Sequence, residues 1–323
     1  MGRFVLRRLL QSVVVLLGVT LVVFLLLQLV PGDPVRVALG TRFDQQTYDA
    51  LRERSGLDRP LVVQYLSYVG HALTGDLGVS FRSGQPVTTI VLERLPATLS
   101  LAVTAVLLAL LVAFPLGVLS AVRSGSFVDH AARVFSQFGV SVPDFWTGIM
   151  GILLFAGVLG WLPPSGYVAL TDDPAGWASH VALPATAVGL VTASILTRFI
   201  RSSVLEVLAE DYVRTAEAKG LRRRVVVVRH VLRNALIPVV TVVGVQLASL
   251  VGGVQLASLV GGVIVIEVLF AWPGIGRLTY DAVQARDYPV LQGAVLFVAT
   301  LFLLTNLLVD VLYARLDPRI RLR

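Results

Sequence analysis

Residues 9–30 read LLQSVVVLLGVTLVVFLLLQLV and carry no charged side chain. The hydrocarbon core of a bilayer is about 30 Å thick, so a helix needs roughly 20 apolar residues to cross it. The stretch therefore predicts a membrane-spanning helix. Its apolar run is longer than that of a secretory signal peptide, and no small-residue cleavage pattern follows it, so we expect it to be retained.

The composition of the whole chain agrees with this reading. Of 323 residues, 56% are hydrophobic and 15% are charged, whereas soluble domains average about 25% charged residues. This excludes an ordinary soluble enzyme and a disordered chain. The sequence has no cysteine, which excludes disulfides, thiolate metal sites and a cysteine nucleophile, and its four histidines argue against a multi-histidine metal site.

Six apolar stretches are long enough to be spans. They cover about 9–30, 98–122, 145–162, 181–197, 237–270 and 290–312. The sequence therefore predicts an all-α integral membrane protein, with residues 1–323 forming a single transmembrane domain of six helices.

The basic residues predict the orientation of these spans. Three arginines precede the first span, two lie between the second and third, nine basic residues lie between the fourth and fifth, and four follow the sixth. These are 18 of the 27 basic residues, and all fall on one side of a six-span chain. By the positive-inside rule that side is cytoplasmic, together with both termini. The net charge of +7 is then a topology signal, and we expect no nucleic-acid partner.

The first connection, residues 31–97, is too long for a plain hairpin. It contains turn residues at 31–34 and a pattern typical of a short helix over 45–55. Apolar and aromatic residues over 61–77 need burial, so we expect a packed external cap. A loosely structured connection is the alternative.

The fifth span contains a literal repeat. Residues 244–252 and 253–261 both read GVQLASLVG, which makes the 34-residue span about 51 Å long as a continuous helix. We therefore expect a break, a bulge or an overhang near the glycine pairs at 252–253 and 261–262.

The connection 198–236 carries the clearest motif. It reads DYVRTAEAKGLRRR over 211–224 and RHVLRNALIP over 229–238. We expect a helix over 204–218, a stop at Gly220 and a second, cationic helix that leads through Pro238 into the fifth span. A helix–glycine–helix unit can dock on a soluble partner, and a basic loop can instead lie on anionic lipid headgroups. The pattern alone leaves both open.

This motif resembles the "EAA" signature loop of ABC-importer permeases, in the variant of the dipeptide/oligopeptide branch. Further matches occur in the same order: RLPATL at 94–99, SVPDFW at 141–146, EVLFAWPGIGR at 267–277 and RDYP at 286–289. The start of the chain resembles the first permease subunit of that branch. The resemblance extends over nearly the whole sequence.

The resemblance implies a type I ABC importer permease fold in the plasma membrane of a prokaryote. It also implies a second homologous permease, two P-loop ATPase subunits that hold ATP and Mg, and an external substrate-binding protein. This chain itself would bind no cofactor. Its signature loop, residues 198–236 with the start of span five, would be a cytoplasmic coupling loop that docks on an ATPase.

Carried over by position, the coupling residues are Tyr212, Arg214, Thr215, Ala216, Ala218, Lys219, Gly220, Leu221, Arg229, Asn234 and Pro238. Arg214 stands where the general signature has an acid, and Pro238 lies 18 residues after Gly220; both departures are traits of the peptide branch. Gly220 permits a close approach or a left-handed turn. Lys219, the only lysine, either contacts an acidic groove or interacts with the helix dipole.

Glu267, at the outer end of span five, is the candidate for the substrate pathway, because an acid near a span is a functional-site hypothesis. A place at the membrane interface beside Trp272 is the alternative. The sequence has no GxxxxGK[ST] loop, GxSxG or HExxH motif, so we expect no enzyme activity and no ATP binding by this chain.

The expected function is translocation of di- or oligopeptides, with a nickel chelate or glutathione as alternative cargo. A stand-alone secondary transporter is a further alternative, although few charges lie within the spans. A scaffold protein that uses the basic loop only for docking is another.

Overall fold

The computed structural model describes residues 2–39, 44–251 and 263–316. These residues form helices and loops without a β-strand, apart from one isolated bridge between Val79 and Pro86. The all-α prediction is confirmed.

Within the described residues, four helices are long and apolar enough to cross a membrane. They are α1 (Gly2–Gln28), α5 (Val87–Val122), α8 (Pro174–Leu208) and α14 (Tyr288–Leu316). Two bent pairs raise the number to six if each pair is one span. The first joins α6 (Phe127–Ser141) to α7 (Asp144–Gly151) and the π-helix η2 (Ile152–Val158). The second runs from α10 (Arg223–Val225) and the π-helix η3 (Val226–Val231) into α11 (Leu232–Val251).

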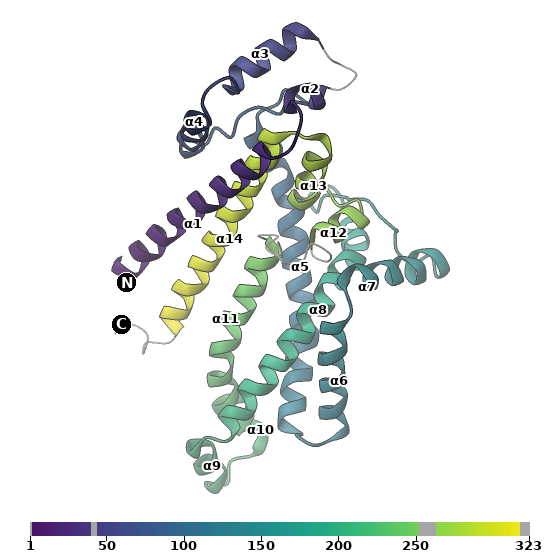
Figure 1. Ribbon diagram of the computed structural model, residues 1–323. Helices are drawn as coiled ribbons and strands as arrows, with labels where there is room; N and C mark the ends of the chain where they lie inside the picture. Colours follow the sequence, from purple (N-terminus) through teal and green to yellow (C-terminus); the bar gives the residue numbers. More distant parts are fainter. Residues whose placement is uncertain (1, 40–43, 252–262, 317–323) are drawn as a thin grey trace.

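The third span differs from its expected range of 145–162. The structure begins this helical segment at Phe127, and the part from Asp144 leaves the bundle at 99° to α6 (Figure 1). The predicted range omits α6, in which Asp129 and Arg133 interrupt the apolar sequence. Asp129 is buried against Arg201, so its charge is accommodated inside the bundle.

Small residues allow α5 and α8 to form the most extensive helix pair of the bundle. A Cβ atom on Gly189 of α8 would lie 2.9 Å from the carbonyl oxygen of Ala105, and one on Gly117 of α5 would lie 2.8 Å from Ile200. Such close backbone approach is the usual basis of helix association within membranes. The α1 helix lies at the edge of the bundle and packs on α14.

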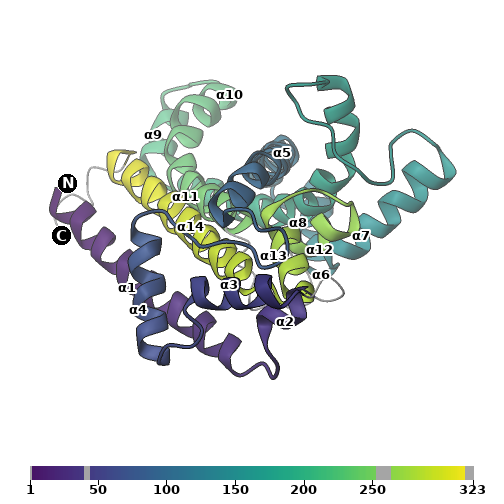
Figure 2. The same cartoon turned by 90° about the horizontal axis from the view of Figure 1, so that it is seen from above.

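The segment after α1 forms three short helices, which we call the outer cap after the position that the sequence predicts for them: α2 (Pro34–Leu39), α3 (Gln45–Ser55) and α4 (Leu61–Leu73). Helix α3 has the bounds that the sequence predicts, because Asp44 accepts a hydrogen bond from the amide of Thr47 and caps its start. Figures 1 and 2 show these helices at the end of the bundle opposite α9.

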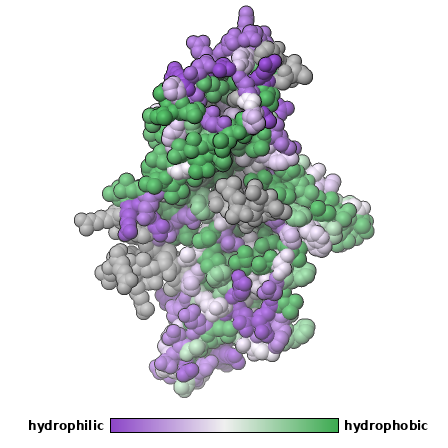
Figure 3. Space-filling model, viewed as in Figure 1, coloured by the Kyte–Doolittle hydropathy of each residue, from purple (hydrophilic) through white to green (hydrophobic). Residues whose placement is uncertain are grey.

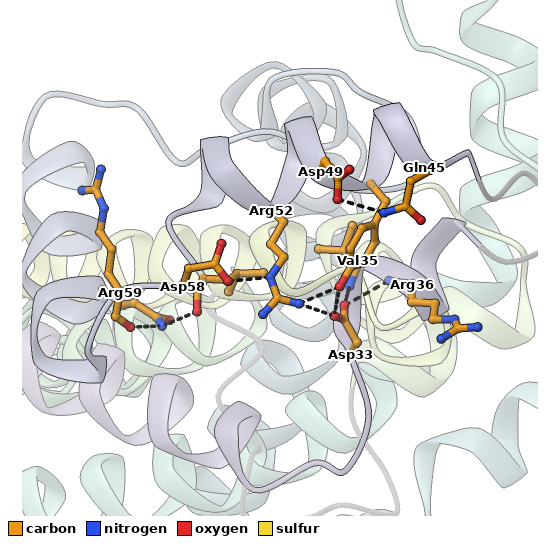
Figure 4. Close-up of polar contacts among 11 residues, drawn as sticks. Asp33, Val35, Arg36, Gln45, Asp49, Arg52, Asp58 and Arg59 are labelled. Carbon is orange, nitrogen blue, oxygen red and sulfur yellow. Dashed lines mark hydrogen bonds and ion pairs between the residues drawn. The ribbon is translucent and has the colours of Figure 1, made fainter.

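A polar network holds α2 and α3 together (Figure 4). Asp33 accepts hydrogen bonds from the Tyr48 hydroxyl and from Nη1 of Arg52, at 2.5 and 3.1 Å. Nε of Arg52 also lies 2.6 Å from the carboxylate of Asp58. Burial raises the pKa of Asp33, but the hydrogen bond from Tyr48, two backbone amides and the charge of Arg52 outweigh it and lower that pKa below its ordinary value.

Helix α4 is less buried than the sequence predicts. None of its side chains is fully buried, and Val62 and Leu66 are exposed. It contacts α1 and α14 through its tyrosines: Tyr65 donates to the carbonyl of Leu17 at 3.0 Å, and Tyr68 donates to that of Gln292 at 3.3 Å.

The duplicated stretch lies partly outside the described residues. Helix α11 ends at Val251 within the first copy of GVQLASLVG, and α12 (Val263–Leu269) follows the second copy. The expected break near 252–253 and 261–262 falls outside the described ranges.

Polar surface gathers at two ends of the molecule. Figure 3 shows hydrophilic residues at the outer cap and again at the end that holds α9 and α10, with mainly apolar surface between them. This distribution is typical of a protein that crosses a membrane.

Candidate functional site

The coupling motif forms a compact projection at one end of the bundle (Figure 1). Its first helix is α9 (Asp211–Ala218), and η3 and the start of α11 return into the bundle. We call residues 211–231 the coupling knob.

The single helix expected over 204–218 is wrong. Helix α8 ends at Leu208, and α9 begins at Asp211 after a short turn. The turn redirects the chain so that Val204 of α8 and Val213 of α9 both pack in one apolar cluster. Burial of both valines therefore outweighs continuation of the helix.

One face of α9 points into the protein. Val213 and Ala216 are buried against Val226 and Val231 of η3. Ala216, which the sequence placed among the contact residues, therefore anchors α9 to the bundle. The buried face fixes which side of α9 is available to a partner.

The opposite face of the coupling knob is exposed. Arg214 forms an ion pair with Asp211 at 3.6 Å on the same helix, and Thr215 donates a hydrogen bond to the carbonyl of Asp211 at 2.9 Å. Most of the coupling residues that the resemblance gives have exposed side chains in the structure. They are Tyr212, Arg214, Thr215, Ala218, Lys219, Leu221, Arg229 and, just after the coupling knob, Asn234. Two further exposed apolar residues, Val225 and Val228, lie beside them.

Gly220 ends α9 in the left-handed region, with φ of +78°. The amide of Gly220 donates to the carbonyl of Glu217 at 2.9 Å, and the amide of Leu221 donates to that of Ala216 at 3.4 Å. This pair of hydrogen bonds is the Schellman arrangement at a helix C-terminus. A Cβ on Gly220 would meet no atom within 4 Å, so within this chain the glycine is required by backbone conformation and not by close packing.

Tyr212 and Asn234 are 22 residues apart in sequence and meet in the structure. Nδ2 of Asn234 donates to the Tyr212 hydroxyl at 2.8 Å, and that hydroxyl donates to the carbonyl of His230 at 3.4 Å. This connects α9 to the start of α11. Pro238 lies inside α11, where the helix axis bends by 49° because proline supplies no amide for the preceding turn.

Two residues that the sequence did not single out connect helices at this end of the bundle. The Ser203 hydroxyl of α8 donates to the carbonyl of Ala235 at 2.7 Å. Nη2 of Arg223 donates to the carbonyl of Val122, at the end of α5, at 2.9 Å. Arg223 belongs to a run of three arginines, and nothing in that run distinguishes it from its neighbours.

Glu267 lies in a different environment from the one expected. It is fully buried and does not lie at an exposed interface beside Trp272. Its carboxylate accepts hydrogen bonds from the Thr98 hydroxyl at 3.2 Å and from the amide of Arg277 at 2.8 Å. It therefore satisfies the N-terminus of α13 (Ile275–Ala285). A Cβ on Gly274 would overlap this carboxylate, so the glycine leaves room for it.

The described part of the chain, which omits residues 1, 40–43, 252–262 and 317–323, contains no group of three or more His, Asp or Glu side chains that could hold a metal ion. The arrangement at the coupling knob is suited to docking: a hydrogen-bonded backbone turn at Gly220, an exposed face of mixed basic and apolar character, and a buried face that fixes its orientation.

Comparison with known proteins identifies the family. Residues 113–322 match the inner membrane component of binding-protein-dependent transport systems, and residues 1–102 match the N-terminal membrane component of such systems. The dipeptide transport system permease protein DppB of Escherichia coli (strain K12) is 42% identical over 99% of this chain and 99% of its own. DppB of Alkalihalophilus pseudofirmus is 40% identical over 98% of this chain and 99% of its own.

A solved structure supports the fold alone. The MetNI methionine ABC transporter, in an inward-facing conformation, superimposes with a TM-score of 0.55 at 16% sequence identity. The match covers 71% of this chain and 96% of the MetNI chain. The chain therefore belongs to the family of inner membrane components of binding-protein-dependent transport systems, and it has the type I ABC importer permease fold.

Proposed function

We propose that this chain is the permease subunit of an ATP-driven importer that translocates di- or oligopeptides. An external binding protein delivers the peptide, and a second homologous permease completes the pathway. Two P-loop ATPase subunits bind and hydrolyse ATP with Mg. The chain itself supplies part of the translocation path, catalyses no reaction and binds no cofactor.

The coupling knob carries this proposal. It lies at one polar end of the bundle, its inner face is fixed by Val213 and Ala216, and its outer face is exposed. A rigid projection of this kind can transmit force from a docked partner, whereas a flexible basic loop on lipid headgroups could not. We assign the contact with an ATPase to the exposed residues Tyr212, Arg214, Thr215, Ala218, Lys219, Gly220, Leu221, Arg229 and Asn234.

The cargo is proposed from the relatives. The Escherichia coli and Alkalihalophilus proteins are named for dipeptide transport, and a Brucella abortus protein, 41% identical over 99% of both chains, is named for peptide transport. A nickel chelate or glutathione is the alternative cargo. Because Glu267 is buried and caps α13, we assign it a structural role and leave it out of the cargo path.

The proposed location is the plasma membrane of a prokaryote, with the coupling knob and both termini in the cytoplasm. The outer cap and the coupling knob lie at opposite ends of the bundle, which suits this topology. The nine basic residues of the 198–236 connection favour the cytoplasmic side for the coupling knob.

Copurification tests the assembly. The chain is tagged, extracted from native membranes in mild detergent, and its partners are identified by mass spectrometry. We expect a second permease, P-loop ATPases and an external binding protein. Recovery of the chain alone, under conditions that preserve a control complex, would favour a stand-alone transporter or a scaffold.

Reconstitution then tests the cargo. The complex is placed in proteoliposomes with its binding protein, and ATP-dependent uptake is measured for labelled dipeptides, longer peptides, a nickel chelate and glutathione. Uptake of peptides supports the proposal, and uptake of only the nickel chelate or glutathione replaces the cargo.

A further inference from the structure

A buried ion pair lies close to the base of the coupling knob. Asp129 is 1% exposed, and Arg201 donates to both of its carboxylate oxygens, from Nε at 2.7 Å and from Nη2 at 3.1 Å. The Ser120 hydroxyl donates to Oδ1 at 2.7 Å, and the amide of Gly125 donates to Oδ2 at 2.9 Å. Arg133, one turn further along α6, lies 3.7 Å from Oδ1.

These groups come from three separate parts of the bundle. Ser120 belongs to the last turn of α5, Gly125 to the turn that follows, and Asp129 to the first turn of α6. Arg201 lies on α8, seven residues or about two turns before that helix ends at Leu208, and the coupling knob begins at Asp211. One carboxylate therefore joins the end of α5, the start of α6 and the end of α8.

Stability alone does not require an ion pair between Asp129 and Arg201. A buried ion pair can often be replaced by apolar residues of similar volume without loss of stability. What the pair adds is a fixed relative orientation, because the planar guanidinium of arginine meets a carboxylate through two parallel hydrogen bonds. The other links near the coupling knob, Ser203 to Ala235 and Arg223 to Val122, are single hydrogen bonds to backbone carbonyls.

We propose that Asp129 and Arg201 are positioning residues for energy coupling. Movement of the coupling knob reaches α8 directly, and the ion pair transmits it to α5 and α6, so that the three helices move as one unit. This inference rests on the proposed function, since it requires ATPase subunits that displace the coupling knob.

The test compares uptake per ATP hydrolysed in the reconstituted complex. The key variant is the double substitution Asp129→Leu with Arg201→Met, which removes both charges and keeps an apolar filling. Its matched control is Asp310→Leu with Arg8→Met, which removes the ion pair between α1 and α14, at 3.1 Å and far from the coupling knob in sequence.

We expect the Asp129/Arg201 double variant to assemble and to keep basal ATP hydrolysis, but to lose at least about fivefold in uptake per ATP, the lower range of a typical coupling free energy. The control keeps the wild-type ratio. Arg201→Lys, which keeps the charge but loses the two-pronged geometry, falls between them. A purely structural role would instead lower the amount of complex and leave its uptake per ATP unchanged.

An unchanged ratio in the double variant would overturn the proposal. If the double variant does not assemble, the ratio measured for Arg201→Lys decides in the same way. If wild-type complex shows no ATP-driven uptake at all, the proposed function fails, and that result is separate from any difference between variants.

Discussion

Replacement of Gly220 tests how the coupling knob keeps its shape. Its φ of +78° is a left-handed conformation that costs an L-residue with a Cβ about 1–2 kcal/mol. A Cβ would meet no atom within 4 Å, so no steric clash is added within this chain. Gly220→Ala should therefore reduce the population of the Schellman turn by roughly five- to 30-fold relative to competing helix ends.

Gly220→Asn separates backbone conformation from contact with a partner. Asparagine adopts the left-handed region more readily than other residues with a Cβ. If the turn is what matters, Asn restores much of the function that Ala loses. If a partner's surface must approach the glycine closely, both substitutions are equally harmful, because each adds a side chain.

The assay is binding-protein-stimulated ATP hydrolysis by the reconstituted complex, together with amide hydrogen exchange at residues 216–221. Gly160→Ala is the matched control, because Gly160 has φ of +63° and open space around it but lies outside the coupling knob. Gly220→Ala is expected to lower stimulation and speed exchange, while Gly160→Ala changes neither. Wild-type stimulation and exchange in Gly220→Ala would refute the reasoning.

Three further substitutions probe other parts of the account. Val213→Ala removes buried apolar contact that stabilises α9 by about 1.5–2 kcal/mol. Amide hydrogen exchange over 211–221 should therefore become faster, and unchanged exchange would show that Val213 does not anchor the helix. Thr98→Val leaves the amide of Ile275, 2.8 Å from the threonine hydroxyl, without its acceptor. The melting temperature of the purified chain should fall by an amount that reflects about 1–3 kcal/mol, whereas Thr98→Ser should preserve it. Equal stability of both variants would contradict the role of Thr98 as acceptor for this amide. The pKa of Asp33 is lowered in the folded cap, so ionised Asp33 stabilises α2 and α3 at any pH above 3.8, the ordinary pKa of this carboxyl group. This stabilisation is lost as the pH falls below 3.8 and through the pKa of the folded state. Protease resistance of residues 44–58 should therefore persist at pH 5 and weaken below about pH 3.8. Asp33→Asn should show reduced resistance at neutral pH with little further loss in acid, and an acid-insensitive wild type would contradict this.

Local patterns predicted the features that depend on short stretches of sequence. The all-α class follows from long apolar runs, and α3 follows from Asp44 at its start and Gly56 at its end. Gly220 was expected to end a helix, and it does so with the hydrogen bonds of a Schellman turn. Each of these depends on neighbours a few residues away.

Contacts between distant segments were not predictable from the sequence. The break after Leu208 arises because Val204 and Val213 share one apolar cluster, which no local propensity indicates. The predicted third span, 145–162, omits α6 with its charged Asp129, and nothing local to Asp129 indicates that Arg201, 72 residues further along the chain, pairs with it. The resemblance gives Ala216 as a coupling residue, and the structure buries it against η3. A signature motif does not distinguish residues that face a partner from those that anchor the helix.

Site-specific cross-linking tests the central claim most directly. The chain has no cysteine, so a single introduced cysteine reacts at one place. Cysteines at Arg214, Ala218 or Leu221 are combined with a short thiol-to-amine cross-linker in native membranes, and a cysteine at the outer-cap residue Gln46 is the control. We predict adducts with a P-loop ATPase subunit from the three coupling-knob positions and none from Gln46. Absence of an ATPase adduct at all three positions, in membranes where the ATPase is present and a known cross-link in the same complex forms, would contradict the account.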